Sequence, residues 1–216
     1  YISGIDCFGS MRDLESKTLR AVGAPSKRFS EDALRILRLF RFAATLNFSI
    51  DERTLDAALK QSGGLENISR ERIAIELKKA VMGQNIKAIS PLIESGALKF
   101  LGLNGCPDFS KLEKLNKNPL LSLFAFLYLA NCDVVAVLDE LKESNINKKY
   151  AADMLKLLKH DAPKTKTDLK ILLCNFSSDI LTDYFELKEA LANKDLSRLK
   201  DLLSETPRIV NVYVSG

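Results

Sequence analysis

Apolar residues recur at helical spacing along most of the chain, and this pattern predicts a mainly α-helical fold. The strongest helical segment begins at Ser30, a candidate N-cap with Glu31 and Asp32 in the first turn, and continues to Asn47. The same periodicity predicts further helices over 51–59, 69–82, 85–95, 118–130, 134–142, 147–159, 167–174, 178–192 and 196–204. Pro91 is expected to divide the segment 85–95, because proline cannot donate a backbone hydrogen bond.

Strand-like patterns are confined to the two ends of the chain. Residues 1–5 and 18–22 are rich in β-branched and aromatic side chains and flank a turn at Gly9 and Ser10. They predict a short N-terminal β-hairpin, which cannot bury a core without the helices. The last segment, 208–214, has strand propensity but no partner in the pattern, and we treat it as an extended tail.

The composition is that of a soluble globular protein, with 46% hydrophobic residues and no Trp. The longest apolar stretch, 120–129, is shorter than the roughly 20 residues of a membrane span and predicts a buried core helix. The four cysteines form no Cys-x-x-Cys pair, so neither a structural zinc site nor a disulfide scaffold is indicated. We therefore expect a cytoplasmic protein with no membrane partner. The chain opens on Tyr1 rather than Met, and we expect it to be part of a longer protein.

A single histidine, His160, limits the catalytic classes that the sequence can supply. Metal-dependent hydrolases with a His-Asp motif need further histidines, and no nucleophile motif lies near His160. The residue follows a predicted helix in a lysine-rich stretch, where a cation complements the helix dipole. We interpret it as a helix C-terminal residue.

Arginine and lysine are unevenly distributed along the chain. The net charge is only +4, but nine arginines lie within the first 72 residues, whereas the rest of the chain uses lysine almost exclusively. A guanidinium is a rigid, bidentate donor suited to bases and phosphates, and an ammonium is a flexible point charge. The distribution is consistent with specific recognition in the N-terminal third, and equally with chance and surface solvation.

Asp32 and Arg35 combine an acceptor and a donor on one face of the strongest predicted helix. At about 100° per residue they lie about 60° apart, with Arg38 about 60° further around the helix. Such a pair can read the edge of cytosine or adenine, because the carboxylate accepts from the exocyclic amine while the guanidinium donates to the neighbouring ring nitrogen. Guanine and uracil do not present that combination. The spacing by itself is better explained by an ordinary i,i+3 ion pair.

Four ordered sequence blocks give the first 100 residues a specific resemblance. The blocks are DCFGSMRDL at 6–14, LRAVG at 19–23, RFSEDALRILR at 28–38 and SRERIAIE at 69–76. Together they resemble the class II tRNA nucleotidyltransferase and poly(A) polymerase family, with its D-x-F-G-G-x-x-D-L, E-D-x-x-R and E-R-I-x-x-E motifs. One departure is Ser10, where the family has its second glycine. Residues 107–216 carry no motif of the family and are assigned by continuity.

The resemblance implies a helical neck, body and tail that follow a catalytic head. Residues 1–25 would be the end of that head, 26–105 the neck, and 106–216 the body and tail. The carboxylates that bind Mg²⁺ would precede Tyr1, so the chain alone is expected to be catalytically inactive. The block at 6–14 follows the catalytic strand in the family, and Asp6 and Asp13 are therefore expected to fix turns rather than bind metal.

The resemblance also assigns roles to individual residues. Asp32 and Arg35, with Arg38, would contact the base of an incoming CTP or ATP, which the protein selects without a nucleic-acid template. Four residues would brace the helix that bears Asp32: Glu31, Glu71, Arg72 and Glu76. A set of lysines on one predicted helix and its approach would face tRNA phosphates, although most such runs are merely solvated: Lys148, Lys149, Lys156 and Lys159.

Several activities share these motifs, and the sequence leaves the choice among them open. The family includes enzymes that add CCA, A alone or CC alone to tRNA, and enzymes that add poly(A) tails. No arginine-rich basic tail is present, which mildly favours tRNA as the substrate. From a different class, the chain could be a non-catalytic helical module that binds RNA or a protein. The oligomeric state is open as well.

Overall fold

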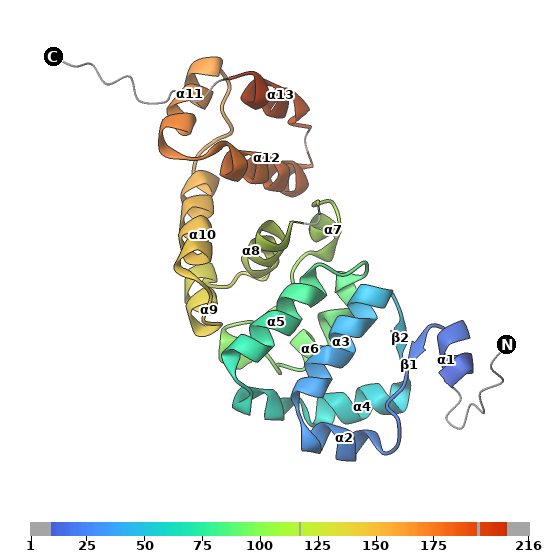
Figure 1. Cartoon of the computed structure of the whole chain (residues 1–216). Helices are drawn as coiled ribbons and strands as arrows, with labels where there is room; N and C mark the ends of the chain where they lie inside the picture. The colour runs from blue at the N-terminus through green and yellow to red at the C-terminus, as the bar shows by residue number, and fades with distance from the viewer. Residues whose placement is uncertain (1–9, 117, 194, 207–216) are drawn as a thin grey trace. The chain divides into compact units, whose positions relative to one another are not determined.

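The computed structural model of the chain describes residues 10–116, 118–193 and 195–206, and it divides into two compact units (Figure 1). Unit 1 comprises Tyr1–Phe109 and Lys117–Glu143, and unit 2 comprises Ser110–Asn116 and Ser144–Gly216. The described residues are mostly helical, which confirms the predicted fold class. The predicted neck, body and tail are functional divisions and stay predictions.

Unit 1 is built from helices and one pair of very short strands. Its elements are α1 (Ser10–Glu15), β1 (Thr18–Leu19), α2 (Pro25–Glu31), α3 (Leu34–Leu46), β2 (Ser49–Ile50), α4 (Glu52–Lys60), α5 (Arg70–Val81), α6 (Ser90–Glu94), α8 (Pro119–Leu129) and α9 (Val134–Glu140). The 3₁₀ helices η1 (Ser62–Asn67), η2 (Ile86–Ile89) and η3 (Lys99–Leu101) connect them, and α7 (Phe109–Leu112) begins at the boundary between the units.

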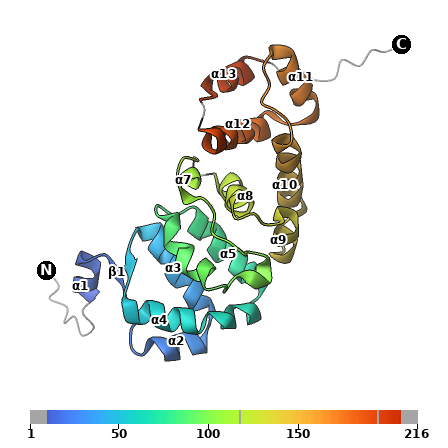
Figure 2. The ribbon, with the colours of Figure 1, turned by 180° about the vertical axis from the view of Figure 1, so that it is seen from behind.

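The core of unit 1 forms around α3, which packs against α5 and η2. Figures 1 and 2 show from opposite sides that α5 lies alongside α3. Ile36, Leu37 and Phe40 on α3 are fully buried, and so are Ile73 and Leu77 on α5. Burial of an aliphatic or aromatic side chain contributes roughly 1.5–3 kcal/mol. The two helices are therefore held together chiefly by their apolar faces.

Two predicted helix boundaries are confirmed by the hydrogen bonds that form them. Asn47 ends α3 in the left-handed region (φ 54°), and its N–H donates to the carbonyl of Ala43. Asp51 caps α4, because its Oδ2 accepts a hydrogen bond from the N–H of Thr54 at 3.1 Å. In both cases the partners lie three or four residues apart, so the sequence alone could place them.

The predicted helix start at Ser30 is wrong. Pro25 stands in the first turn of α2, and Ser30 lies inside that helix, where its hydroxyl donates to the carbonyl of Lys27 at 2.9 Å. The next helix, α3, begins only at Leu34. Asp32 lies between the two helices in an extended conformation (φ −154°, ψ 104°). Asp32 and Arg35 therefore do not share one helix face.

The strand pair of unit 1 is parallel and joins distant segments. Thr18 lies opposite Ser49, and Leu19 lies opposite Ile50. From the sequence, we predict a strand at 18–22 that pairs with a strand at 1–5. Residues 1–5 and the predicted tail at 208–214 lie outside the described residues. The pairing with β2 was not predicted, because no local pattern records which distant segment a strand will meet.

A close approach between α5 and α3 depends on Gly83. A Cβ atom at this position would lie 2.6 Å from the carbonyl carbon and oxygen of Ala44. Just beyond, the N–H of Asn85 donates to the carbonyl of Ala44 at 2.9 Å, and its Nδ2 donates to Oδ1 of Asn47 at 3.1 Å. Glycine thus lets the end of α5 contact the backbone of α3 directly.

The apolar segment predicted as a core helix is α8, and Leu121–Leu127 within it are buried in unit 1. Among the described residues, no single helix combines the length and hydropathy of a membrane span. Together the pair α8 and α9 meets both criteria, but the two helices are bent by 119°.

Unit 2 contains α10 (Asn145–Leu158), α11 (Lys166–Asn175), α12 (Ser178–Ala192) and α13 (Ser197–Glu205). Helix α12 packs against the other three (Figure 2). Tyr184 on α12 is fully buried, and its hydroxyl donates to the carbonyl of His160 at 3.1 Å. His160 follows the C-terminus of α10, as the sequence predicted.

Candidate functional site

The carboxylate of Asp32 connects the α2–α3 junction to α5. Its Oδ1 accepts a hydrogen bond from the N–H of Leu34 at 3.0 Å, and its Oδ2 lies 3.1 Å from Nη2 of Arg72. About a third of the Asp32 side chain remains exposed. Each carboxylate oxygen keeps a lone pair beyond these bonds, so Asp32 can still accept from a ligand.

One carboxylate oxygen of Glu31 holds two arginines. Oε2 of Glu31 accepts from Nη1 of Arg35 at 2.9 Å and from Nη1 of Arg28 at 3.4 Å. Arg28 also donates from Nε to the carbonyl of Val22 at 3.2 Å. The partner of Arg35 is thus Glu31 and not Asp32, and the expected side-by-side pair of Asp32 and Arg35 is replaced by two separate ion pairs.

Glu76 is a buried carboxylate between two further arginines of α3. Its residue exposure is 8%, its Oε2 lies 2.6 Å from Nε of Arg41, and its Oε1 lies 4.0 Å from Nε of Arg38. The contact with Arg41 lacks hydrogen-bond alignment and is an ion pair only. Burying this carboxylate would be costly without a cation beside it, and Arg41 supplies one.

A cavity of about 390 Å³ opens beside α3. Four guanidiniums line it: Arg20, Arg28, Arg35 and Arg38. Its apolar part comes from Val22, Phe29, Leu39 and Phe42, among others. The volume falls in the roughly 300–1,000 Å³ range of small-molecule sites. Cationic donors beside apolar side chains suit a ligand with an anionic group and a flat ring. We call this space the arginine cavity.

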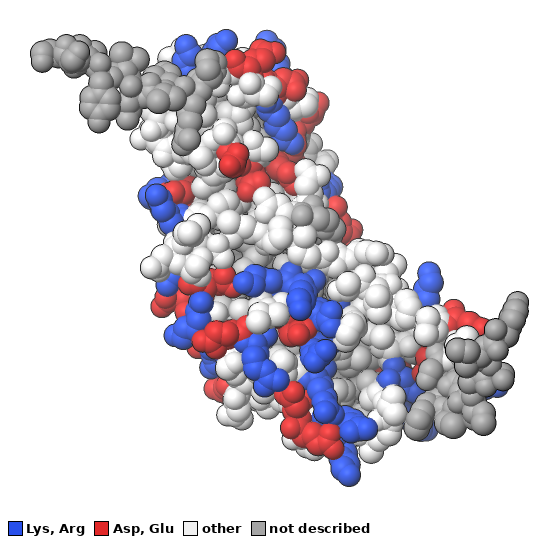
Figure 3. Space-filling model, in the orientation of Figure 1, with Lys and Arg blue, Asp and Glu red and all other residues white. Residues whose placement is uncertain are grey.

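The surface of unit 1 over α3 and α5 is rich in Lys and Arg, with carboxylates among them (Figure 3). Of the residues predicted to contact the base, Arg35 and Arg38 line the arginine cavity, whereas Asp32 is not among its lining residues. Of the residues predicted to brace the site, Glu31, Arg72 and Glu76 form the ion pairs given above. Glu71 is exposed in the first turn of α5.

The four predicted tRNA-binding lysines all lie on α10 or at its end, in unit 2. Lys149, Lys156 and Lys159 are exposed, and Lys148 is half-buried. Lys156 pairs with Asp153 at 3.1 Å. The helix prediction that brought these lysines together is confirmed, while their role in binding RNA stays a prediction.

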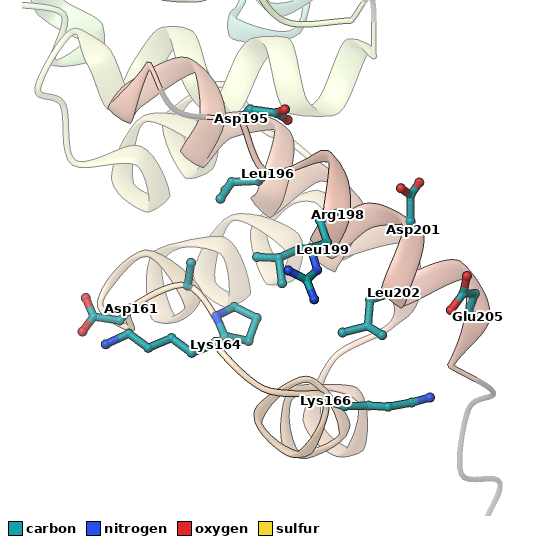
Figure 4. Close-up of a pocket in the computed structure, with 12 residues that line it drawn as sticks. Asp161, Lys164, Lys166, Asp195, Leu196, Arg198, Leu199, Asp201, Leu202 and Glu205 are labelled. Atoms are coloured by element: carbon teal, nitrogen blue, oxygen red, sulfur yellow. The ribbon is translucent and has the colours of Figure 1, made fainter.

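A larger cavity of about 1050 Å³ lies within unit 2, between the segment 161–166 and α13 (Figure 4). Its charged lining consists of three cations and four carboxylates: Lys164, Lys166, Arg198, Asp161, Asp195, Asp201 and Glu205. The two signs nearly balance there. Of these two cavities, the arginine cavity has more cations than carboxylates among its lining residues, although each of its arginines pairs with a nearby carboxylate, and it is the better candidate for an anionic ligand.

Sequence reasoning missed Arg20, Arg28, Arg41 and Phe42 as site residues. Arg20 and Arg28 stand within the blocks that carry the family resemblance, so a signal for them was present. Arg41 continues the three-residue spacing of the arginines on α3 and could have been found in the same way. Phe42 gave no signal, because an aromatic residue in an apolar helical pattern predicts a core position.

Comparisons with known protein sequences agree with the resemblance. A family model described as "Probable RNA and SrmB- binding site of polymerase A" matches residues 47–105. The CCA-adding enzyme of Lactococcus lactis subsp. cremoris (strain MG1363) is 42% identical over 164 residues, which are 70% of this chain and 40% of that protein. The CCA-adding enzyme of Staphylococcus saprophyticus is 32% identical over 209 residues, which are 95% of this chain and 51% of that protein. The chain thus spans about half the length, or less, of these relatives.

Solved structures share the fold. The Bacillus stearothermophilus CCA-adding enzyme in complex with CTP has a TM-score of 0.79 and 22% identity, and the match covers 93% of this chain and 53% of that one. A tRNA nucleotidyltransferase complexed with a primer tRNA and an incoming ATP analog has a TM-score of 0.59 and 21% identity, over 93% of this chain and 64% of that one.

Proposed function

We propose that this chain supplies base selection and tRNA binding to a nucleotidyltransferase. The chain belongs to the CCA-adding enzyme and poly(A) polymerase family. The intact enzyme is cytoplasmic and adds CCA, or part of it, to tRNA 3′ ends. The observation that carries this proposal is the arginine cavity, with four guanidiniums beside an apolar wall. A nucleoside triphosphate combines the two matching parts, a polyphosphate and an aromatic base.

Base selection is assigned to Asp32 and Arg35. It requires the nucleotide to bring together two side chains that pair separately with Arg72 and Glu31 before it binds. The carboxylate of Asp32 accepts from the exocyclic amine of cytosine or adenine, while Arg35 donates to the adjacent ring nitrogen. Uracil places a carbonyl where Asp32 needs a donor, and guanine places an N–H where Arg35 needs an acceptor. The protein thereby acts as its own template for CTP and ATP.

The ion pairs around the site hold these groups before the nucleotide arrives. Arg72 fixes one oxygen of Asp32, and Glu31 fixes one nitrogen of Arg35. Glu76 sits between Arg38 and Arg41. Each guanidinium has five N–H donors, so these contacts orient the arginines while leaving donors for phosphate and base. Preorganised donors lower the entropic cost of binding.

The transfer step is attack of the tRNA 3′-hydroxyl on the α-phosphate, with pyrophosphate as the leaving group. Mg²⁺, when bound, neutralises charge on the phosphates. Among the residues that the structure describes, no group of three or more His, Cys, Asp or Glu side chains could hold a metal ion. We assign the metal ligands to a catalytic head outside these 216 residues, and we expect the chain by itself not to transfer nucleotides.

The test is nucleotide incorporation by the protein expressed from the intact gene. Each of the four nucleoside triphosphates is offered with Mg²⁺ to tRNAs that lack CCA, that end after its second C, and that are complete. We expect ordered addition of C, C and A, which then stops. Addition of A alone or of unlimited A would assign another activity of the family, and no incorporation would favour a non-catalytic RNA-binding module.

Single substitutions test whether Asp32 and Arg35 select the base. Asp32→Asn and Arg35→Ala are expected to admit U and G, whereas Arg53→Ala, an exposed arginine on α4, serves as the matched control and keeps the selection of the unaltered protein. Unchanged base choice in both site variants would refute the assignment.

A further inference from the structure

Phe42 is an exposed aromatic residue on α3, a helix that also exposes Leu46 at its C-terminal end. Its relative exposure is 37%, although Phe40, two residues earlier on α3, is fully buried. The exposed ring lines the arginine cavity, in which Arg35 and Arg38 also stand.

One face of the Phe42 ring is covered by a guanidinium. The guanidinium carbon of Arg41 lies 3.7 Å from the ring centroid. Arg41 is itself largely buried, with 13% of its side chain exposed, and is fixed by its ion pair with the buried Glu76. A cation over an aromatic face is attracted to the electron-rich face of the ring. The chain Glu76–Arg41–Phe42 therefore fixes the orientation of an aromatic plane that borders the cavity.

We propose that Phe42 is the stacking surface for a nucleobase in the arginine cavity. This inference rests on the proposed function and adds a binding residue to it. The cations bind the phosphates but cannot distinguish a nucleotide from a bare polyphosphate, whereas an aromatic plane adds stacking for a nucleotide that a bare polyphosphate cannot make. The ring tolerates every base, since each has a π-face, and selection among bases remains with Asp32 and Arg35.

Two ligands carry the ring that Phe42 requires: a nucleoside triphosphate and the 3′-terminal nucleotide of an RNA. Both present a flat base next to phosphate, so both fit a cavity with guanidiniums beside an aromatic wall. Titration with each ligand separates the two sources.

The sequence contains no Trp, which makes Phe42→Trp a unique fluorescent probe at the proposed surface. The 216-residue chain carrying this change is titrated with CTP, ATP, inorganic tripolyphosphate and a short RNA that ends in CC. The matched control is Ile171→Trp, at a 58% exposed position on α11 in unit 2. Calorimetry on the unaltered chain measures binding of the same ligands independently of the probe.

We expect CTP or ATP to quench the emission of the Phe42→Trp chain with saturation, while tripolyphosphate binds without comparable quenching and the control does not respond. Quenching by the RNA alone would assign the surface to the 3′-terminal base instead. If calorimetry detects nucleotide or RNA binding but none of the base-bearing ligands quenches more than tripolyphosphate, the stacking role is refuted and the proposed function stands. If no ligand binds the unaltered chain, the proposed nucleotide site fails together with this inference.

A second pair of variants separates stacking from simple apolar filling. Phe42→Leu keeps a large apolar side chain without a ring, and Phe42→Tyr keeps the ring. Loss of stacking is expected to weaken nucleotide binding roughly tenfold in Phe42→Leu, with little change in Phe42→Tyr and none for tripolyphosphate. Equal affinities of the Leu and Tyr variants for CTP and ATP would overturn the proposal.

Discussion

Asp32 and Arg72 lie 40 residues apart in the sequence, and their side chains form an ion pair in which Nη2 of Arg72 lies 3.1 Å from Oδ2 of Asp32. The pair ties the short connection between α2 and α3 to the first turns of α5. Both side chains are partly exposed, at 33% for Asp32 and 51% for Arg72. Such exposed pairs contribute under about 1 kcal/mol to stability, so removing this one should affect recognition more than folding.

Arg72→Ala is expected to relax base selection in the protein from the intact gene, because the carboxylate of Asp32 loses the partner that orients it. The free energy of unfolding should change by less than about 1 kcal/mol. Incorporation of each nucleoside triphosphate and urea unfolding measure the two effects. Arg53→Ala is the control, and an Arg72→Ala protein that selects as strictly as this control would contradict the prediction.

Gly83→Ala should destabilise unit 1, because the added methyl would lie 2.6 Å from backbone atoms of Ala44 and force α5 away from α3. Overpacking of this kind costs about 1–3 kcal/mol. Gly63→Ala is the matched control, since a Cβ there has no neighbour within 4 Å. Urea unfolding of both variants makes the comparison, and equal midpoints would show that the contact between α5 and α3 can adjust freely.

Burial, reinforced by the charge of Asp161, raises the pKa of Tyr184 to about 12. An unfolded tyrosine titrates near 10. Because the folded pKa is the higher one, the stability from neutral Tyr184 is complete below about pH 10 and is lost as the pH rises toward about 12.

Tyr184→Phe should therefore lessen the fall in the free energy of unfolding between about pH 10 and about pH 12. A residual fall is expected, because burial also raises the pKa of Tyr150, whose hydroxyl donates to Asp183 at 2.7 Å. Urea unfolding at a series of alkaline pH values measures the slope. Identical slopes for the variant and the unaltered chain would contradict the prediction.

Replacing both Lys149 and Lys156 of α10 with Gln should weaken tRNA binding and flatten its dependence on salt. Each lost phosphate contact lowers the slope of log K against log salt by about 0.9 for duplex and about 0.7 for single-stranded nucleic acid. Filter binding over a range of salt concentrations measures both quantities. Lys60→Gln, on α4 at 73% side-chain exposure, is the control, and equal slopes in the two variants would assign tRNA contacts elsewhere.

Helix positions were predictable from the sequence where the signal is local. Asp51 caps the amide of a residue three positions later, and Asn118 caps the first turn of α8 in the same way. The start of α3 was not predictable from Ser30, because Pro25 begins an earlier helix that contains it. A capping residue cannot serve as a cap once it lies inside another helix, where its hydroxyl bonds backward to a carbonyl.

The candidate site was predictable in its residues but not in its contacts. Asp32, Arg35 and Glu76 come from motif blocks that the sequence displays, yet their partners depend on how α2, α3 and α5 pack. Arg72 pairs with Asp32, and Phe42 borders the same cavity as residues from distant segments. The hydrophobic periodicity of a helix carries no information about such distant contacts. Tertiary packing alone decides those contacts, so they required the structure.

One face of α3 is packed in the core of unit 1, and the other face is exposed. The side chains that pack in unit 1, among them Ile36, Leu37 and Phe40, alternate with the exposed Arg35, Arg38 and Phe42. A substitution on the exposed face leaves the packed face untouched. On the proposed function, substitutions on the exposed face would change nucleotide selectivity without disturbing the packed face, so new nucleotide preferences could evolve on an unchanged scaffold.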